Sequence, residues 1–158
     1  MVERFEKFSY YLSELSRYWH KIAAEEMAEY GLKGPYAVYF TTLYQYPDGL
    51  TPVELGALCS RDKADVSRAV SLLEKKELVR KSRDGERQYR ARVTLTETGW
   101  TLAENISHKA NAAVEQGGKG LTEAQRESLY FALELITANL QVLSRDGLNT
   151  IMEPNTYP

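Results

Sequence analysis

The sequence predicts a mainly α-helical protein that carries one small β-hairpin. Hydrophobic residues recur at helical spacing near both ends of the chain, and two short helices with clear start signals lie close together within residues 51–75. After Leu78 the helical spacing gives way to alternation, which is typical of a half-buried strand. With 43% hydrophobic residues, a chain of 158 residues can form one compact core with helical extensions.

A long helix is expected at the N-terminus. Its apolar residues are separated alternately by three and four positions, which gives a narrow seam of the kind used in helix pairing. They are Phe5, Phe8, Leu12, Leu15, Trp19 and Ile22. Tyr11 and Tyr18 widen this seam. Gly34-Pro35 marks the end of the segment, and a second helix is expected over about residues 36–46.

Two short helices follow. Thr51 caps the first, and Glu54 completes a capping box with it. The candidate inward residues of this helix are Val53, Leu55 and Leu58. Asp62 caps the second helix after a tight turn, and its inner face would hold Val66, Ala69, Val70 and Leu73. Two short helices joined by such a turn form a helix-turn-helix.

The alternating segment predicts a hairpin directly after the helix-turn-helix. Asp84-Gly85 separates residues 79–82 from residues 88–95, and Asp-Gly between alternating runs is a strong hairpin signal because both residues tolerate positive φ. This hairpin is interpreted as a wing. Thr96 then caps a helix that extends to about residue 116, and a capping box at Thr122 starts a last helix. The apolar seam of that helix is Leu129, Leu133, Ile136, Leu140 and Leu143.

Positive charge is concentrated around these two motifs. The whole chain has a net charge of −2, but residues 61–92 contain eleven Lys/Arg against six Asp/Glu. This segment therefore has a net charge of +5 and the remainder −7. A basic island in an acidic chain indicates a local polyanion-binding surface. The alternative is a solvated charged face without a ligand.

The exposed face of the second short helix provides candidate contacts to duplex DNA, because a helix fits the major groove and its first turns reach base edges. The candidates on this helix and around it are Thr51, Arg61, Lys63, Ala64, Asp65, Ser67, Arg68, Ser71 and Lys75. Asp65 has an alternative role, in which it caps its own helix or orients Arg68. On the wing, Arg83, Arg87 and Arg90 are candidates for a narrow minor groove. The alternative for these arginines is a charged edge that prevents aggregation.

The chain resembles the MarR (multiple antibiotic resistance regulator) family of transcription regulators. The matching segments are Leu50-Thr51-Pro52-Val53-Glu54-Leu55, Asp62-Lys63-Ala64-Asp65-Val66-Ser67-Arg68-Ala69-Val70, Leu73-Glu74-Lys75-Lys76-Glu77-Leu78-Val79 and Val93-Thr94-Leu95-Thr96-Glu97-Thr98-Gly99. Two departures are visible. Glu77 stands where the family usually has a glycine, so the helix end either accepts left-handed strain or uses another cap. Asp84-Gly85-Glu86-Arg87 lies about one residue out of the family register, which leaves Arg83 as the rival of Arg87 for the minor groove.

The resemblance implies a homodimer and a winged helix-turn-helix lobe flanked by dimerisation helices. It places the dimerisation region at residues 1–34 and 105–147, the DNA-binding lobe at 35–104 and a loose tail at 148–158. It also implies a repressor that reads a pseudo-palindrome in double-stranded DNA and that is released by a small aromatic or phenolic effector. Some relatives sense oxidation instead. A winged-helix module for protein interaction remains the alternative from another class.

A dense set of aromatic residues on the first two helices is a candidate effector pocket: Tyr11, Tyr18, Trp19, Tyr36, Tyr39 and Phe40. The alternative is that these rings pack in the dimer interface. Cys59 is either a redox sensor, since it precedes the helix that would dock on DNA, or a small buried side chain. It is the only cysteine, which fits a reducing cytoplasm. Neither a metal, a cofactor, an enzymatic activity nor a membrane partner is expected, because no matching motif or long apolar run is present.

Overall fold

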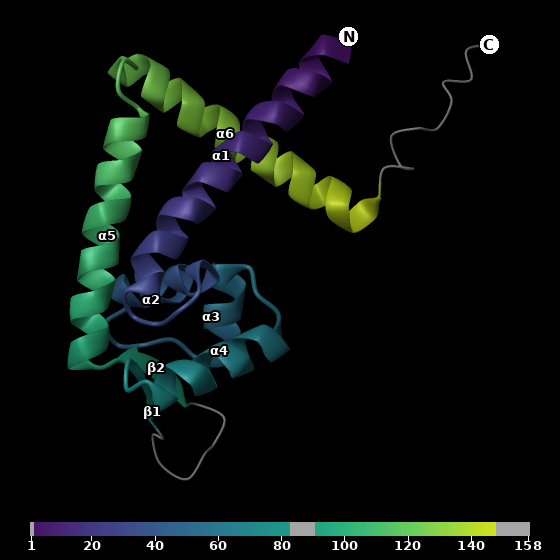
Figure 1. The fold of residues 1–158 in the computed structure, drawn as a ribbon. Coiled ribbons are helices and arrows are strands. Elements are labelled where there is room, and N and C mark those ends of the chain that lie inside the picture. The colour runs from purple at the N-terminus through teal and green to yellow at the C-terminus, as the bar shows by residue number, and fades with distance from the viewer. Residues whose placement is uncertain (1, 83–90, 148–158) are drawn as a thin grey trace. The chain divides into compact units, whose positions relative to one another are not determined.

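The computed structural model of the chain describes residues 2–82 and 91–147. Its elements are α1 (Val2–Ala28), the 3-10 turn η1 (Gly34–Tyr36), α2 (Ala37–Tyr44), α3 (Pro52–Cys59), α4 (Lys63–Lys75), β1 (Val79–Ser82), β2 (Arg92–Leu95), α5 (Glu97–Gly117) and α6 (Glu123–Asp146) (Figure 1). This helical fold with a two-stranded antiparallel hairpin confirms the predicted fold class. The predicted Asp84-Gly85 turn and the predicted tail at residues 148–158 lie outside the described residues.

The chain divides into two compact units, residues 1–112 and residues 113–158, with the division inside α5. The first unit contains every element from α1 to β2 and most of α5. The second contains the end of α5 and the whole of α6. The predicted assignment of residues 1–34, 35–104 and 105–147 to dimerisation and DNA binding stays a prediction.

One hydrophobic core holds the first unit together. Its largest fully buried side chains come from five helices and from β2, and they include Phe40 of α2, Leu55 of α3 and Leu73 of α4. Met27 of α1 and Leu102 of α5 reach the same core, so the two long helices are anchored to the helix-turn-helix at one end. Burying side chains of this size stabilises the fold by about 1.5–3 kcal/mol each.

The helix-turn-helix begins as predicted, but α3 buries a different face. Thr51 and Glu54 form the expected capping box, in which the Thr51 amide donates to Glu54 Oε2 at 2.8 Å. Leu55 is buried together with Gly56 and Cys59, whereas Val53 is 79% exposed and Leu58 is 49% exposed. The prediction that Val53 and Leu58 point inward is therefore wrong. At 3.6 residues per turn, positions 55, 56 and 59 form one side of the helix, and positions 53 and 58 flank it.

The chain reverses after α4 through a left-handed residue that is not glycine. Glu77 has φ +59°, its amide donates to the Glu74 carbonyl at 2.9 Å, and the next amide, from Leu78, donates to the Leu73 carbonyl at 3.0 Å. This is the Schellman pattern of helix ends. Of the two predicted alternatives, the left-handed conformation is the one that occurs, at a cost that glycine would avoid.

The first turn of α5 lies directly against this reversal. The Thr96 amide donates to the Leu78 carbonyl at 3.1 Å, and Thr96 Oγ1 donates to the Glu77 carbonyl at 2.7 Å. Thr96 Oγ1 also accepts from the Gly99 amide at 3.0 Å, which confirms Thr96 as the predicted helix cap. A Cβ atom on Gly99 would lie 1.9 Å from the Leu78 carbonyl oxygen. Only glycine permits this approach.

A third segment of the chain pairs with the hairpin, which the sequence pattern does not indicate. β1 and β2 pair with Val79 opposite Leu95 and Lys81 opposite Val93. Leu50, just before α3, adds a bridge on the other side of β2: its amide donates to the Val93 carbonyl at 3.1 Å, and the Val93 amide donates back at 2.7 Å. The bridge ties the start of the helix-turn-helix to the wing.

We expect Gly99→Ala to destabilise the protein by at least about 1–3 kcal/mol, because the methyl group forces the α5 start away from Leu78. Gly117→Ala is the matched control in the same helix, since a Cβ there meets nothing within 4 Å. Thermal and urea unfolding followed by circular dichroism would compare the two variants. Equal midpoints for both would show that the close approach does not constrain the fold.

We expect Glu77→Gly to stabilise the protein by about 0.5–1 kcal/mol, since glycine adopts positive φ without the steric cost that Glu77 bears. Glu77→Ala is the control, because it removes the same charge and keeps the Cβ atom. If the alanine variant gains as much stability in urea unfolding as the glycine variant, the gain comes from charge and not from backbone strain.

Candidate nucleic-acid interface

The DNA-facing candidate helix, α4, exposes the surface that the sequence predicts. Asp62 caps it by accepting from the Asp65 amide at 2.7 Å. The predicted inner residues Val66, Ala69, Val70 and Leu73 are all buried. The side chains left exposed are Lys63, Ala64, Ser67, Arg68, Ser71 and Lys75. Because α4 is capped at its start and packs against the core along one side, it holds these exposed groups in a fixed arrangement.

Asp65 and Arg68 form an ion pair on this surface. Arg68 Nη2 lies 2.5 Å from Asp65 Oδ1, and the two side chains are 70% and 44% exposed respectively. The contact matches the alternative role of Asp65, in which it orients Arg68. Exposed pairs of this kind contribute only about 0–1 kcal/mol, so the guanidinium group can exchange its carboxylate for another acceptor at little cost.

Two other candidate contacts, Arg61 and Thr51, differ in whether their side chains are already engaged within the fold. Arg61, in the turn before α4, is exposed; its amide donates to the Gly56 carbonyl at 2.9 Å, but its guanidinium group has neither a hydrogen bond nor an ion pair with a described residue. Thr51 is committed to its capping box, because its amide and its Oγ1 both donate to Glu54 Oε2, at 2.8 and 2.9 Å. The same hydrogen bonds lower the pKa of Glu54, which keeps the carboxylate ionised in its capping role.

Some members of the basic island stabilise the fold instead of facing a ligand. The Arg92 guanidinium donates to the Gly49 carbonyl at 2.7 Å, and Lys81 is ion-paired with Glu74 at 3.5 Å. No local pattern in the sequence indicates either contact, because each joins residues from different elements. Arg83, Arg87 and Arg90, the wing candidates, lie outside the described residues.

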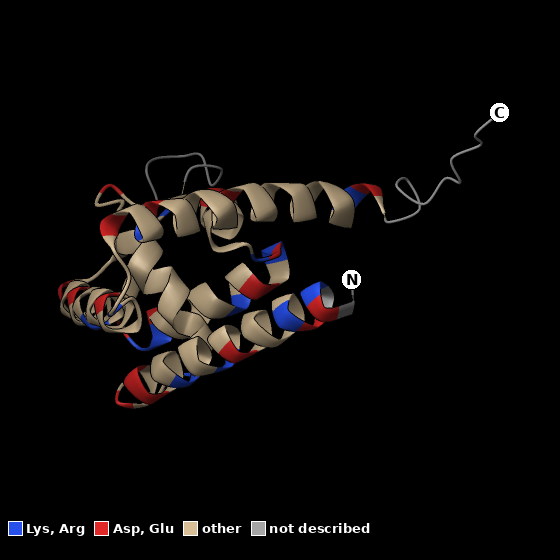
Figure 2. Ribbon diagram, turned by 90° about the horizontal axis from the view of Figure 1, so that it is seen from above, with Lys and Arg blue, Asp and Glu red and all other residues tan. Residues whose placement is uncertain are grey.

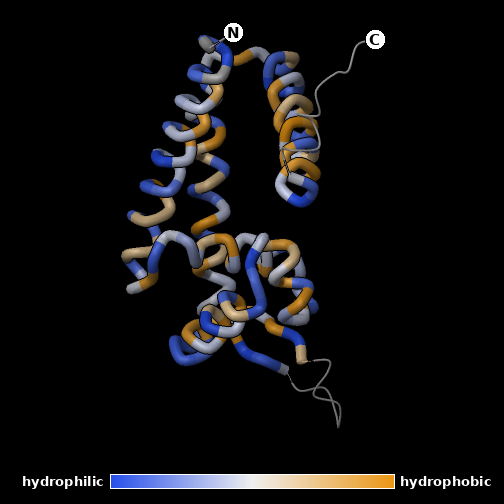
Figure 3. Tube along the Cα trace, turned by 90° about the vertical axis from the view of Figure 1, so that its right-hand side faces the viewer, coloured by the Kyte–Doolittle hydropathy of each residue, from blue (hydrophilic) through white to orange (hydrophobic). Residues whose placement is uncertain are grey.

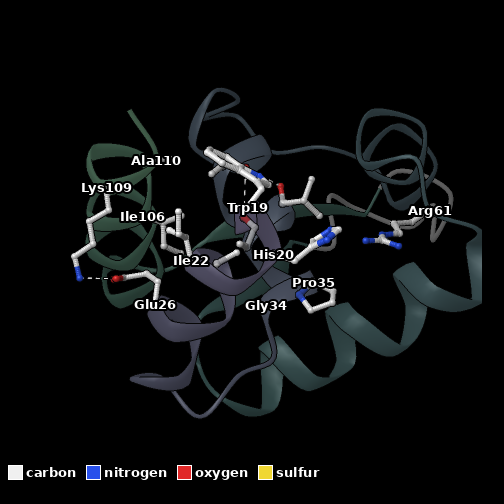
Figure 4. A pocket seen from close by; sticks show the side chains of 14 residues that line it. Trp19, His20, Ile22, Glu26, Gly34, Pro35, Arg61, Ile106, Lys109 and Ala110 are labelled. Atoms are coloured by element: carbon white, nitrogen blue, oxygen red, sulfur yellow. Dashed lines mark hydrogen bonds and ion pairs between the residues drawn. The ribbon is translucent and has the colours of Figure 1, made fainter. Parts of the chain in front are cut away.

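A cavity of about 230 Å³ lies between α1, the η1–α2 segment, the turn before α4 and α5 (Figure 4). The side chains that form its walls include Trp19, Ile22, Val38 and Ile106. The Lys109 ammonium and Glu26 Oε2 are ion-paired at 2.5 Å along one side. The other oxygen, Glu26 Oε1, is buried and has no hydrogen-bond partner among the described residues.

The six aromatic residues predicted for an effector pocket do not surround one cavity. Trp19 lines the cavity just described, whereas Tyr36 and Tyr39 line a second hollow beside α4. Phe40 is fully buried in the core, and Tyr11 and Tyr18 are exposed on α1. The prediction grouped aromatic residues that lie close together in the sequence of the first two helices. It did not include the residues that α5 contributes to the cavity.

Cys59, the last residue of α3, is buried against α2. Its Sγ atom lies 3.5 Å from Thr42 Oγ1 and 3.8 Å from the Val38 carbonyl oxygen. Burial raises the pKa of the thiol, with smaller opposing effects from Thr42 and Arg61. A raised pKa reduces the reactive thiolate, so these observations favour the buried, structural alternative over a redox sensor.

Within residues 2–82 and 91–147, no three His, Cys, Asp or Glu residues converge as metal ligands do. None of the helices described is both long and apolar enough to cross a bilayer.

Residues 30–88 match the model of the MarR family. No curated protein is a significant match to the sequence. Among solved structures, the chain is similar to a MarR transcriptional regulator from Methanosarcina mazei Go1. The two are 25% identical, the alignment covers 87% of this chain and 99% of that one, and the TM-score is 0.73.

Two further similar structures were solved with DNA. The S. aureus MepR–DNA complex is 22% identical, with coverage of 84% and 97% and a TM-score of 0.75. A MarR family transcriptional regulator from Listeria monocytogenes, complexed with a 26mer DNA, is 23% identical, with coverage of 86% and 92% and a TM-score of 0.75. The family model therefore matches the segment from just after α1 through β1, and the chain as a whole shares the winged helix-turn-helix fold of the solved MarR transcriptional regulators to which it is similar.

Proposed function

We propose that this chain is a homodimeric, sequence-specific DNA-binding regulator that represses transcription from a pseudo-palindromic operator. The observation that carries the proposal is the exposed face of α4, a capped helix that buries Val66, Ala69, Val70 and Leu73 and leaves basic and small side chains on its outer face. A helix of this kind fits the major groove. The two similar proteins solved with DNA support the same class of ligand.

Each candidate contact has a role in this proposal. Arg68 would pair with a guanine edge, Ser67 with a neighbouring base, and Ala64 with a thymine methyl group. The phosphate contacts would come from Arg61, Lys63, Ser71 and Lys75. Arg87, or its rival Arg83, would enter the minor groove, with Arg90 beside it.

Dimerisation is supported by large apolar side chains that stay exposed in the described part of the chain. On α1, Leu12 is 54% exposed and Leu15 is 68% exposed, and on α6 Leu133 and Leu140 are each nearly half exposed. Between Ser128 and Ser144, α6 has a single charged residue, Glu134, and hydrophobic residues recur along its length (Figures 2 and 3). Exposed apolar stripes of this length mark protein interfaces. A second copy of the chain would place two α4 helices in successive major grooves, roughly 34–36 Å apart.

Release by a small aromatic effector is the last part of the proposal. The cavity between α1, α2 and α5 supports it, because it is concave, mostly apolar and lined by the Trp19 ring. The cavity adjoins the turn that leads into α4 through Arg61. A ligand there would act close to the DNA-binding surface.

We expect binding to random duplex DNA to weaken steeply with salt, because basic side chains displace counterions from phosphates. Against a site selected from a random duplex library, Arg68→Ala should cost about 1–3 kcal/mol and relax base preference at one position. Arg17→Ala, a paired arginine on α1, is the charge-matched control. Fluorescence anisotropy of labelled duplex DNA over a series of salt concentrations measures both the salt dependence of binding and the effect of Arg68→Ala. Absence of duplex binding even at low salt would favour the protein-interaction alternative.

We expect Leu15→Glu to convert the dimer into a monomer, since an unpaired carboxylate buried in an interface costs several kcal/mol. Ser13→Glu adds the same charge on the opposite side of α1 and should leave the dimer intact. Light scattering after size-exclusion chromatography gives the mass of each. A wild-type protein that is monomeric at micromolar concentration would refute the dimer.

A further inference from the structure

A hollow of about 270 Å³ lies between α4 and the segment that joins α1 to α2. The polar side chains that line it are Lys33, Tyr36, Tyr39, Arg61, Asp65 and Arg68. Lys33 lies far before the basic island of residues 61–92, so the clustering of charge along the sequence does not reveal it. The fold brings this lysine to the side of the helix that is proposed to face DNA.

The hollow has a net positive charge. Lys33, Arg61 and Arg68 contribute three cations and Asp65 one carboxylate, which leaves a charge of +2. Arg68 is paired with Asp65, whereas the side chains of Lys33 and Arg61 pair with no described residue. Burial raises the pKa of Tyr39, so its hydroxyl group stays protonated and able to donate a hydrogen bond. Unpaired cations around a concave surface are suited to an anion that is rich in oxygen acceptors.

The backbone fixes the position of Lys33 at the edge of this hollow. Leu32, immediately before it, is buried in the core, and a Cβ atom on Gly34, immediately after it, would lie 3.1 Å from the Ala24 backbone nitrogen of α1. The Lys33 carbonyl accepts from the Tyr36 amide at 3.0 Å. The exposed side chain therefore extends from a backbone that is held on both sides.

Arg68 connects the hollow with the outward face of α4. Its side chain lines the hollow, and it is exposed on the same face as Ala64 and Ser71, which lie one helical turn away in either direction. The major groove is about 12 Å wide, so a helix about 10–12 Å across that lies in it has phosphates close to both of its sides. The hollow lies along one of these sides. The anion nearest to it would therefore be a phosphate of the same duplex.

We propose that one backbone phosphate of the bound duplex occupies this hollow, held by Lys33 and Arg61, and that Lys33 is thus a DNA-contact residue outside both the helix-turn-helix and the wing. The inference rests on the proposed function, because it adds a contact to the same surface. When Arg68 turns from Asp65 to a base edge, the Asp65 carboxylate loses its partner beside the phosphate. Lys33 and Arg61 offset this repulsion. Such a contact positions α4 in the groove and carries no base preference.

The contribution of Lys33 is tested with Lys33→Gln, with Lys119→Gln as the matched control. Lys119, between α5 and α6, is likewise exposed and its side chain pairs with no described residue. Anisotropy with the selected duplex gives the slope of log affinity against log salt concentration. Lys33→Gln should lower this slope by about 0.9, which corresponds to a loss of about eightfold at about 0.1 M salt and convergence with the wild type near 1 M.

The same variants distinguish a phosphate contact from a base contact or a folding defect. The loss in Lys33→Gln should be equal on selected and random duplexes, unlike that of Arg68→Ala, and its thermal midpoint should equal that of the wild type. Lys119→Gln should keep the wild-type slope. An unchanged slope in Lys33→Gln, or an equal decrease in both variants, would overturn the inference.

The position of the contact is tested by replacing single phosphates of the selected duplex with neutral methylphosphonates. At one phosphate of each half-site, the replacement should weaken wild-type binding more than binding by Lys33→Gln, because the variant has already lost part of that contact. At the other phosphates, the two proteins should lose affinity equally. Equal losses at every phosphate would contradict a phosphate held by Lys33.

Failure of this inference and failure of the proposed function give different results. Steep salt dependence in the wild type with the same slope in Lys33→Gln would remove the phosphate contact and leave the DNA-binding regulator intact. Absence of duplex binding by the wild type at low salt would refute the proposed function and the inference together.

Discussion

The contact between the reversal after α4 and the first turn of α5 determines where α4 lies. The Leu78 carbonyl accepts from the Thr96 amide, and Gly99 lets α5 approach that carbonyl more closely than any side chain allows. The amides and carbonyls of Glu77 and Leu78 all have hydrogen-bond partners, which explains why the strained Glu77 conformation persists. Because Val79 pairs with Leu95 immediately afterwards, the same contact sets the position of the wing strands relative to α4.

The parts of the fold that the sequence predicts are those decided within a few residues. Thr51, Asp62, Thr96 and Thr122 each cap a helix by bonding to an amide three positions ahead, so the pattern is readable locally. The inward face of α3 was not readable in this way. Five of the eight residues of α3 are hydrophobic and they lie all round the helix, so hydrophobicity alone marks no single side, and burial depends on where α2 and α4 contact it.

In the candidate site, too, features decided by neighbouring residues could be predicted, and features decided by distant residues could not. The outer face of α4 follows from helical spacing and was predicted residue by residue, whereas the use of each charge depends on distant partners. Arg92 and Lys81 are bound to Gly49 and Glu74, which leaves Arg61, Lys63 and Lys75 as cations around α4 whose side chains pair with no described residue. Fewer basic side chains are therefore available at this surface than the sequence segment contains. The cavity lined by Trp19 was located only in part, because α5 supplies Ile106 and Lys109 from more than eighty residues beyond Trp19.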